Sequence, residues 1–354
     1  MKHKPSICTM SLGRCFAGHP LEHKLDMAKK YGFLGIEVFY EDLVDFANVT
    51  HGDTTDASQI AAAHAIRELC DARGLEVITL QPLMHFGALF DRAEQARRLD
   101  EASGLWFKLS HALGTDLILL PSSFLGADKV SDDMDLLEAD MRELADLGLA
   151  EEPPIRFAHE ALCWGTHVVT WEQSWELVQR VDRPNFGICF DTFNIAGRIY
   201  ADPASKTACA SNADAAFLTS MQTLLSTVDV SKIFLLQVAD AERLASPLGT
   251  PSHPFYHPEQ PARMSWSRNC RLFYGEGSYG AYLPVQTILS VLVQGLGFEG
   301  WLSFEVFNRA LTEERPEVPE EMARRAAGSW QRMVRGIGLS VEDETMETRV
   351  QAML

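Results

Sequence analysis

The nine residues FGICFDTFN, numbered 186–194, join a short apolar run to a group of polar side chains. Residues 187–190 are apolar without the alternation of a half-exposed strand, which predicts a strand buried on both faces, as in a parallel sheet. Asp191 follows at once, and a carboxylate in such a place is costly unless it is hydrogen-bonded, paired with a cation or bound to a metal. Taken alone, Asp191 is most simply interpreted as the cap of the following turn or helix.

Outward from this stretch, strand-length apolar runs alternate with helix-length amphipathic segments. The other expected strands are 6–12, 35–40, 75–80, 117–120, 155–160, 233–238 and 300–306. The expected helices are 21–31, 57–73, 91–113, 133–147, 171–181, 213–228, 282–295 and 319–336.

Eight strand–helix units in 354 residues predict an α/β fold, a single (β/α)₈ TIM barrel over residues 1–339 followed by a C-terminal tail, 340–354. Two doubly wound domains are the alternative. It is disfavoured because no Gly-x-Gly-x-x-Gly motif follows a strand and no Walker loop is present.

A long segment, 240–278, follows the seventh expected strand and is rich in Pro, Gly, Ser and His. A loop of that length after a strand is more often functional than idle. Trp266 within it is typical of a lid, and equally of a packed insertion.

The composition limits the class of protein. A hydrophobic fraction of 46% and a charged fraction of 23% are those of a soluble globular protein, and no apolar run approaches the roughly 20 residues of a membrane span. The net charge of −18 argues against a nucleic-acid surface. The seven cysteines include no Cys-x-x-Cys pair, which indicates reduced thiols in a cytoplasmic protein. A homo-oligomer is compatible with this composition.

Four polar residues end four consecutive expected strands: Glu160, Asp191, Gln237 and Glu305. Strand ends at the carboxyl face of a barrel form the active face, and consecutive strands are neighbours, so these side chains can converge. Three carboxylates would repel one another unless a cation lay among them. Oxygen donors alone favour a hard divalent ion, Mg²⁺ or Mn²⁺ with Co²⁺ as a further option, and exclude a Cys-rich zinc site. For any one residue, a helix cap or an arginine partner is the simpler interpretation.

This ligand order resembles that of the xylose-isomerase-like barrels, which include sugar isomerases and epimerases, endonuclease-IV-type enzymes and 3-dehydroshikimate dehydratases. Further stretches resemble the dehydratases in their fungal, quinate-catabolic form. The most specific are DTFNIAGR (191–198) and ARMSWSRN (262–269), and the others are GFLGIEVFY (32–40), LQPLMHF (80–86), QVADAER (237–243) and GFEGWLSFE (297–305).

The resemblance implies a metal-dependent lyase that converts 3-dehydroshikimate, a cyclic hydroxy-keto acid, to protocatechuate and water. A base removes the acidic proton next to the ketone, a divalent ion stabilises the enolate, and loss of the hydroxyl with tautomerisation gives the aromatic ring. His85, just beyond the third strand, is the expected acid/base group. Glu37 on the second strand is a second acid/base or hydroxyl-binding candidate.

Substrate-binding residues are expected in two places. Some relatives carry His three residues after the strand-six Asp, where this chain has Asn194; because an amide cannot act as a base, Asn194 is assigned to substrate hydrogen bonding. Arg268 and Arg271, with Arg198 as a third option, are the candidates for the substrate carboxylate, since a guanidinium matches a carboxylate bidentately.

Two other functions use the same parts. A sugar isomerase or epimerase would use the same metal and base through an enediolate, but a neutral sugar does not need the arginines. A non-catalytic binding protein on an inactive barrel is disfavoured, because all four ligand positions carry oxygen donors.

Overall fold

The computed structural model describes residues 2–340. Its eight main strands are parallel and close a barrel, which confirms the predicted single (β/α)₈ fold. Around the barrel the strands follow in the order β1 (His3–Cys8), β10 (Gly300–Phe304), β7 (Ile233–Val238), β6 (Phe186–Asp191), β5 (Arg156–Glu160), β4 (Leu117–Pro121), β3 (Glu76–Gln81) and β2 (Gly35–Phe39).

Twelve α-helices lie within residues 2–340. Their bounds are α1 (Leu21–Lys30), α2 (Tyr40–His51), α3 (Asp56–Asp71), α4 (Arg92–Glu101), α5 (Phe107–Leu113), α6 (Met134–Leu149), α7 (Trp171–Val181), α8 (Thr192–Ile199), α9 (Ala213–Thr227), α10 (Ala262–Cys270), α11 (Val285–Leu289) and α12 (Val318–Met333).

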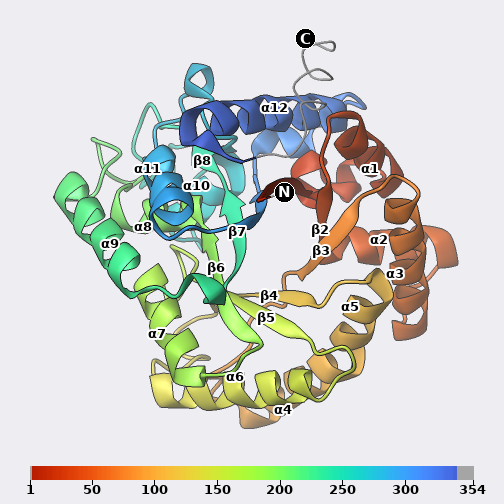
Figure 1. Cartoon of the computed structure of the whole chain (residues 1–354). Helices are drawn as coiled ribbons and strands as arrows, with labels where there is room; N and C mark the ends of the chain where they lie inside the picture. Colours follow the sequence, from red (N-terminus) through yellow and green to blue (C-terminus); the bar gives the residue numbers. More distant parts are fainter. Residues whose placement is uncertain (1, 341–354) are drawn as a thin grey trace. The chain divides into compact units, whose positions relative to one another are not determined.

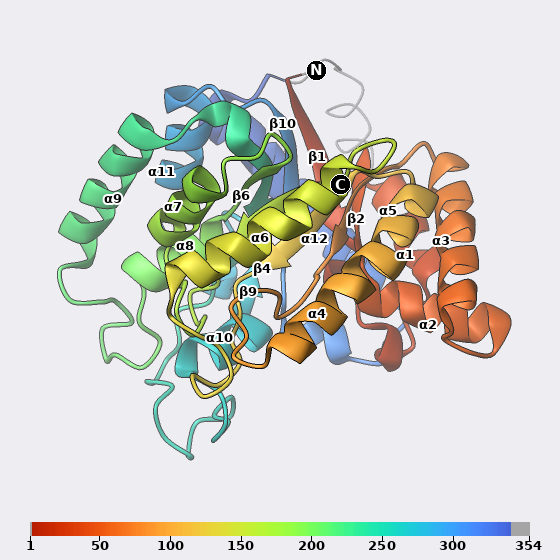
Figure 2. The ribbon, with the colours of Figure 1, turned by 90° about the horizontal axis from the view of Figure 1, so that it is seen from below.

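Residues 36–190 and 231–235 form one compact unit. Here α3 packs against both α2 and α5, as the orange part of the ribbon shows in Figures 1 and 2. Strand β4 is buried along its whole length, and β5 is buried after its first residue. The continuous burial of β4 explains why that strand consists of apolar residues without alternation.

A second unit comprises, among the described residues, 2–35, 191–230 and 236–340. Strand β1 pairs with β10 in parallel register from His3 opposite Gly300 to Ile7 opposite Phe304. Helix α8 packs against α9 and α11, and α1 packs against α12. In Figure 1, α12 is the dark blue helix and α9 the green one.

The structure differs from the predicted elements in several places. The first strand ends at Cys8, and residues 9–12 form a 3₁₀ turn. The helix predicted over 91–113 is two helices, α4 and α5, with a π-helical turn between them. Helices α2 and α8 were not predicted, because each begins directly after its strand without a loop that would mark a boundary.

The segment 240–278 contains secondary structure of its own. Strands β8 (Asp240–Ala241) and β9 (Arg271–Leu272) pair antiparallel, and α10 lies between them in the sequence. This arrangement brings the two ends of the segment together and places Ala241 opposite Arg271.

Of the predicted tail, only Ser340 belongs to the described residues. Its backbone N–H donates a hydrogen bond to His3 Nδ1 at 3.1 Å. Residues 341–354 lie outside the described part of the chain. No helix of residues 2–340 has both the length and the apolar character that crossing a membrane requires.

Asp240 ties β8 to the segment before α11. Its Oδ1 accepts hydrogen bonds from three backbone N–H groups, those of Ala241 (2.7 Å), Tyr282 (3.1 Å) and Leu283 (2.9 Å). The side chain is buried, and this burial raises the pKa of Asp240 to about 6 against the effect of the three N–H groups, with a further upward contribution from Glu276.

This pKa gives a testable dependence of stability on pH. Because the pKa of Asp240 in the folded state lies above its ordinary value of 3.8, the folded protein binds more protons between pH 4 and pH 6, and its stability falls as the pH rises through that range. We expect Asp240→Asn, which keeps an acceptor oxygen, to be more stable than the wild type at pH 7.5 by about 1–3 kcal/mol. The gain should vanish near pH 4.

Urea unfolding at both pH values measures the difference. The exposed Asp132→Asn is the matched control, and it should change the free energy of unfolding by less than about 0.5 kcal/mol. A loss of stability at pH 7.5 in Asp240→Asn would show that the carboxylate charge is stabilising.

Candidate functional site

Asp191 ends β6 and is buried with the rest of that strand. Its Oδ1 accepts a hydrogen bond from the backbone N–H of Phe193 at 2.8 Å, so Asp191 caps helix α8. Its Oδ2 accepts two further hydrogen bonds, from Asn194 Nδ2 and from Arg271 Nη1, both at 2.8 Å. The helix-cap interpretation therefore describes one oxygen of Asp191, and the other belongs to a larger polar network.

Arg271 links two of the predicted metal ligands. The same Nη1 that contacts Asp191 lies 3.1 Å from Glu305 Oε2 and 3.3 Å from the Glu305 main-chain oxygen. The Arg271 side chain is only 1% exposed, and its Nε donates to Ser267 Oγ at 3.0 Å. One buried guanidinium thus serves two buried carboxylates.

Gln237 lies on the strand next to Glu305. In the parallel pairing of β7 with β10, Gln237 is opposite Ser303, two residues before Glu305. Since side chains alternate along a strand, Ser303 and Glu305 face the same side, and Gln237 shares it. Gln237 and Glu305 are both buried.

Glu160 ends β5 and is opposite Cys189 of β6, two residues before Asp191. Glu160, Asp191 and Glu305 can each offer a buried carboxylate oxygen to a metal ion. Asp191 and Glu305 with Arg271 carry a formal charge of −1, which favours a cation at this place. All of these donor atoms are oxygens, so the donor set fits a hard divalent ion such as Mg²⁺ or Mn²⁺.

The two acid/base candidates belong to the unit of residues 36–190 and 231–235. Glu37 is completely buried, and Gln81 Nε2 donates a hydrogen bond to its Oε2 at 2.8 Å. His85 has a left-handed backbone, with φ of 57°, and its ring meets that of Phe124 edge-on at 4.3 Å. Its buried Nδ1 has no hydrogen-bond partner among the described residues.

Burial is also the main influence on the charge of His85. Together with the positive charge of Arg98 it lowers the pKa of His85 to about 4. The imidazole is therefore neutral near pH 7, which is the state of a proton acceptor.

The remaining predicted residues are arginines with exposed side chains. Arg198 lies in the last turn of α8, and Arg268 lies near the end of α10. Within residues 2–340, the Arg268 side chain makes no hydrogen bond or ion pair. Partial desolvation and the positive charge of Arg14 lower the pKa of the Arg268 guanidinium, so this side chain would gain from an anionic partner.

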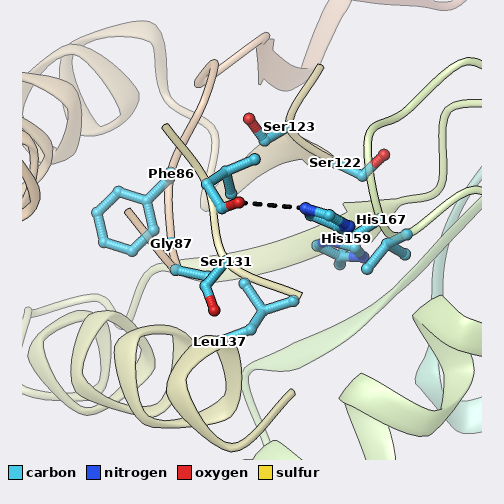
Figure 3. A pocket seen from close by; sticks show the side chains of 11 residues that line it. Phe86, Gly87, Ser122, Ser123, Ser131, Leu137, His159 and His167 are labelled. Carbon is cyan, nitrogen blue, oxygen red and sulfur yellow. Dashed lines mark hydrogen bonds between the residues drawn. The ribbon is translucent and has the colours of Figure 1, made fainter. Parts of the chain in front are cut away.

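A small cavity of about 20 Å³ adjoins β5 and has room for about one water molecule. His159 and His167 line it with Ser122, Ser123 and Ser131 (Figure 3). His159 Nδ1 lies 2.7 Å from Ser174 Oγ on α7, and burial lowers the pKa of His159 to about 4. The dashed line in Figure 3 marks the 3.1 Å contact of His167 Nε2 with the Val130 carbonyl oxygen.

Sequence reasoning missed three residues that hold the site. Ser267 contacts Arg271 directly, and the rings of Phe193 and Phe307 lie 4.3 Å and 5.1 Å from the Arg271 guanidinium carbon. The only available signal was the spacing of Ser267 four residues before Arg271. The two rings left no signal, because their contacts depend on how the chain folds back.

A model of the family described as "Xylose isomerase-like TIM barrel" matches residues 25–332. The chain is 57% identical to a 3-dehydroshikimate dehydratase of Neurospora crassa over 348 residues, 97% of this chain and 96% of the relative. It is 31% identical to a protein of the same name from Pseudomonas aeruginosa over 303 residues, 86% of this chain but 38% of that relative.

Solved structures agree on the fold. The IolI protein, whose crystal structure contains a zinc atom, superposes with a TM-score of 0.67 at 18% identity, over 96% of this chain and 100% of that one. The closed barrel, the family model covering most of the chain and the relatives above lead to one conclusion: the chain belongs to the xylose isomerase-like TIM barrel family.

Proposed function

We propose that this protein is a divalent-metal-dependent 3-dehydroshikimate dehydratase, a hydro-lyase that forms protocatechuate in quinate catabolism. The observation that carries the proposal is the 57% identity, over 97% of the chain, to the Neurospora crassa protein of that name. The buried carboxylate group at the strand ends supports it, because the elimination needs a cation beside the reacting oxygens.

Glu160, Asp191, Gln237 and Glu305 would hold the metal. Oxygen donors alone favour Mg²⁺ or Mn²⁺, with Co²⁺ as a further option. When bound, such an ion supplies positive charge that stabilises the enolate oxygen of the substrate.

His85 is proposed to move the proton. Its neutral imidazole accepts the proton next to the ketone and, once protonated, can donate it to the departing hydroxyl group. Glu37, held by Gln81, is the second acid/base or hydroxyl-binding candidate. Asn194, held by Asp191, is proposed to hydrogen-bond a substrate hydroxyl.

Arg268 is proposed as the main partner of the substrate carboxylate. Arg271 was an equal candidate from the sequence, but its Nη1 contacts two carboxylates of the protein, and a third would have to share it. Arg198 stays a further candidate on α8.

The setting of the reaction follows from the composition. All seven cysteines are free, and most are buried, which suits the reducing cytoplasm. The net charge of −18 suits a small-molecule substrate and disfavours nucleic acid. A homo-oligomer is compatible with all of these features.

Metal dependence is the first test. Incubation with 3-dehydroshikimate and Mn²⁺ or Mg²⁺ should produce the ultraviolet absorbance of a catechol acid, and chelation with EDTA should abolish it reversibly. Glu305→Gln should lower kcat/KM by at least about 10³-fold and reduce bound metal, because it removes a charged ligand.

The exposed Glu313→Gln is the control and should behave as the wild type. Absence of product with every metal would reject the dehydratase, and turnover of a neutral ketose instead would favour a sugar isomerase or epimerase. Full activity and metal content in Glu305→Gln would reject the ligand assignment.

The carboxylate clamp is tested at Arg268. We expect Arg268→Gln to lower kcat/KM by about 10–100-fold, mainly through KM, because a charge-assisted hydrogen bond contributes about 1.5–3 kcal/mol. Steady-state kinetics should show partial recovery in Arg268→Lys and no effect of Arg315→Gln, at an exposed surface arginine. An unchanged KM in Arg268→Gln would move the clamp elsewhere.

His85 is tested by its pH dependence. Since its pKa lies near 4, the neutral base should persist at pH 5.5 and be lost only as the pH falls through about 4. The acid limb of kcat/KM should therefore fall well below pH 6.5, and His85→Asn should lower kcat by about 10²–10⁴-fold. An acid limb near pH 6.5 that disappears in His85→Asn would contradict the lowered pKa.

A further inference from the structure

Arg271 is a buried cation inside an otherwise acidic group. We propose that it is a built-in counter-ion, a positioning residue that keeps Asp191 and Glu305 together when no metal is bound and that weakens their affinity for a divalent ion. The inference rests on the proposed metal site, since it assigns these two carboxylates to the metal.

The contacts show that one charge is shared. Arg271 Nη1 lies 2.8 Å from Asp191 Oδ2 and 3.1 Å from Glu305 Oε2, and the exposed fractions of the three side chains are 1%, 0% and 5%. Two desolvated carboxylates this close would repel each other strongly. Without the guanidinium, the metal-free protein would bury the two carboxylates with no cation between them, which is strongly destabilising.

Arg271 is also fixed in place, so it cannot simply leave when a metal arrives. Its Nε is bonded to Ser267 Oγ, and its guanidinium lies near the ring faces of Phe193 and Phe307. Its backbone N–H donates to the Phe307 carbonyl oxygen at 3.0 Å, and its own carbonyl oxygen accepts from Asn308 Nδ2 at 2.8 Å. The counter-ion is therefore a permanent part of the site.

The charge balance gives the consequence. Asp191 and Glu305 with Arg271 sum to −1. Without Arg271, a divalent ion would meet −2 from the same two carboxylates. A guanidinium hydrogen-bonded to the ligand oxygens draws electron density from them and repels the incoming cation. Arg271 thus lowers metal affinity while it leaves the bound ion a stronger Lewis acid.

Arg325 provides a matched comparison in the same unit. It pairs with Glu276 through two 2.8 Å hydrogen bonds, and their side chains are 8% and 5% exposed. This pair joins one cation to one anion and includes none of the proposed metal ligands. Removing it should therefore cost stability without changing metal affinity.

The experiment compares the wild type with Arg271→Gln, Arg271→Lys and Arg325→Gln. Thermal unfolding in EDTA reports metal-free stability, and titration with Mn²⁺ at pH 8, followed by the electron paramagnetic resonance signal of the free ion, reports affinity. Arg271→Gln should lower the metal-free Tm by about 5–10 °C and bind Mn²⁺ about tenfold more tightly. Arg271→Lys, which keeps the charge, should stay within about threefold of the wild-type Kd, and Arg325→Gln should lower Tm alone.

The outcomes separate the two proposals. If the wild type binds no Mn²⁺, the metal site itself is rejected. If the wild type binds Mn²⁺ but Arg271→Gln binds it equally or more weakly, the counter-ion role is overturned and the metal site stands. If Arg271→Gln does not fold in EDTA, Mn²⁺ must restore its folding, and failure to do so overturns the counter-ion role.

Discussion

Burial of carboxylates at the ends of parallel strands is the constraint on which this structure depends. Asp191 ends an apolar strand and Glu305 follows one, and both are almost inaccessible to water. Each carboxylate oxygen in such a place needs donors or a cation. Asp191 accepts hydrogen bonds from the backbone N–H of Phe193 and from the amide of Asn194. The Arg271 guanidinium donates to both Asp191 and Glu305.

The segment 240–278 positions that guanidinium. Its two strands, β8 and β9, hold Arg271 opposite Ala241, and α10 brings Ser267 to the Arg271 side chain. Asp240 fixes β8 from the other side through three backbone N–H groups. A segment that resembles an irregular loop in composition is therefore a scaffold for one residue of the site.

Strand positions and ligand types could be predicted because each is a local property. Burial on both faces produces uninterrupted apolar runs such as 187–190, and the first polar residue after such a run marks the carboxyl end of the strand. Helix α8 could not be placed in the same way, because it starts at Thr192 without a loop. The contacts of Arg271 could not be predicted either, because an arginine in a polar segment can bind a carboxylate of the substrate as well as a carboxylate of the protein.

The sequence by itself determined the barrel and the four oxygen donors at its strand ends, because these follow from periodicity and from residue type at defined positions. It also indicated the family, through the resemblance of stretches such as DTFNIAGR (191–198) to known relatives. Only the tertiary structure decided what Arg271 contacts. Its partners Asp191 and Glu305 lie 80 and 34 positions away along the chain, and contacts over such separations arise only from how strands and loops pack. The stretch 186–194 therefore identified the acid at the centre of the site, and the fold supplied the cation that accompanies it.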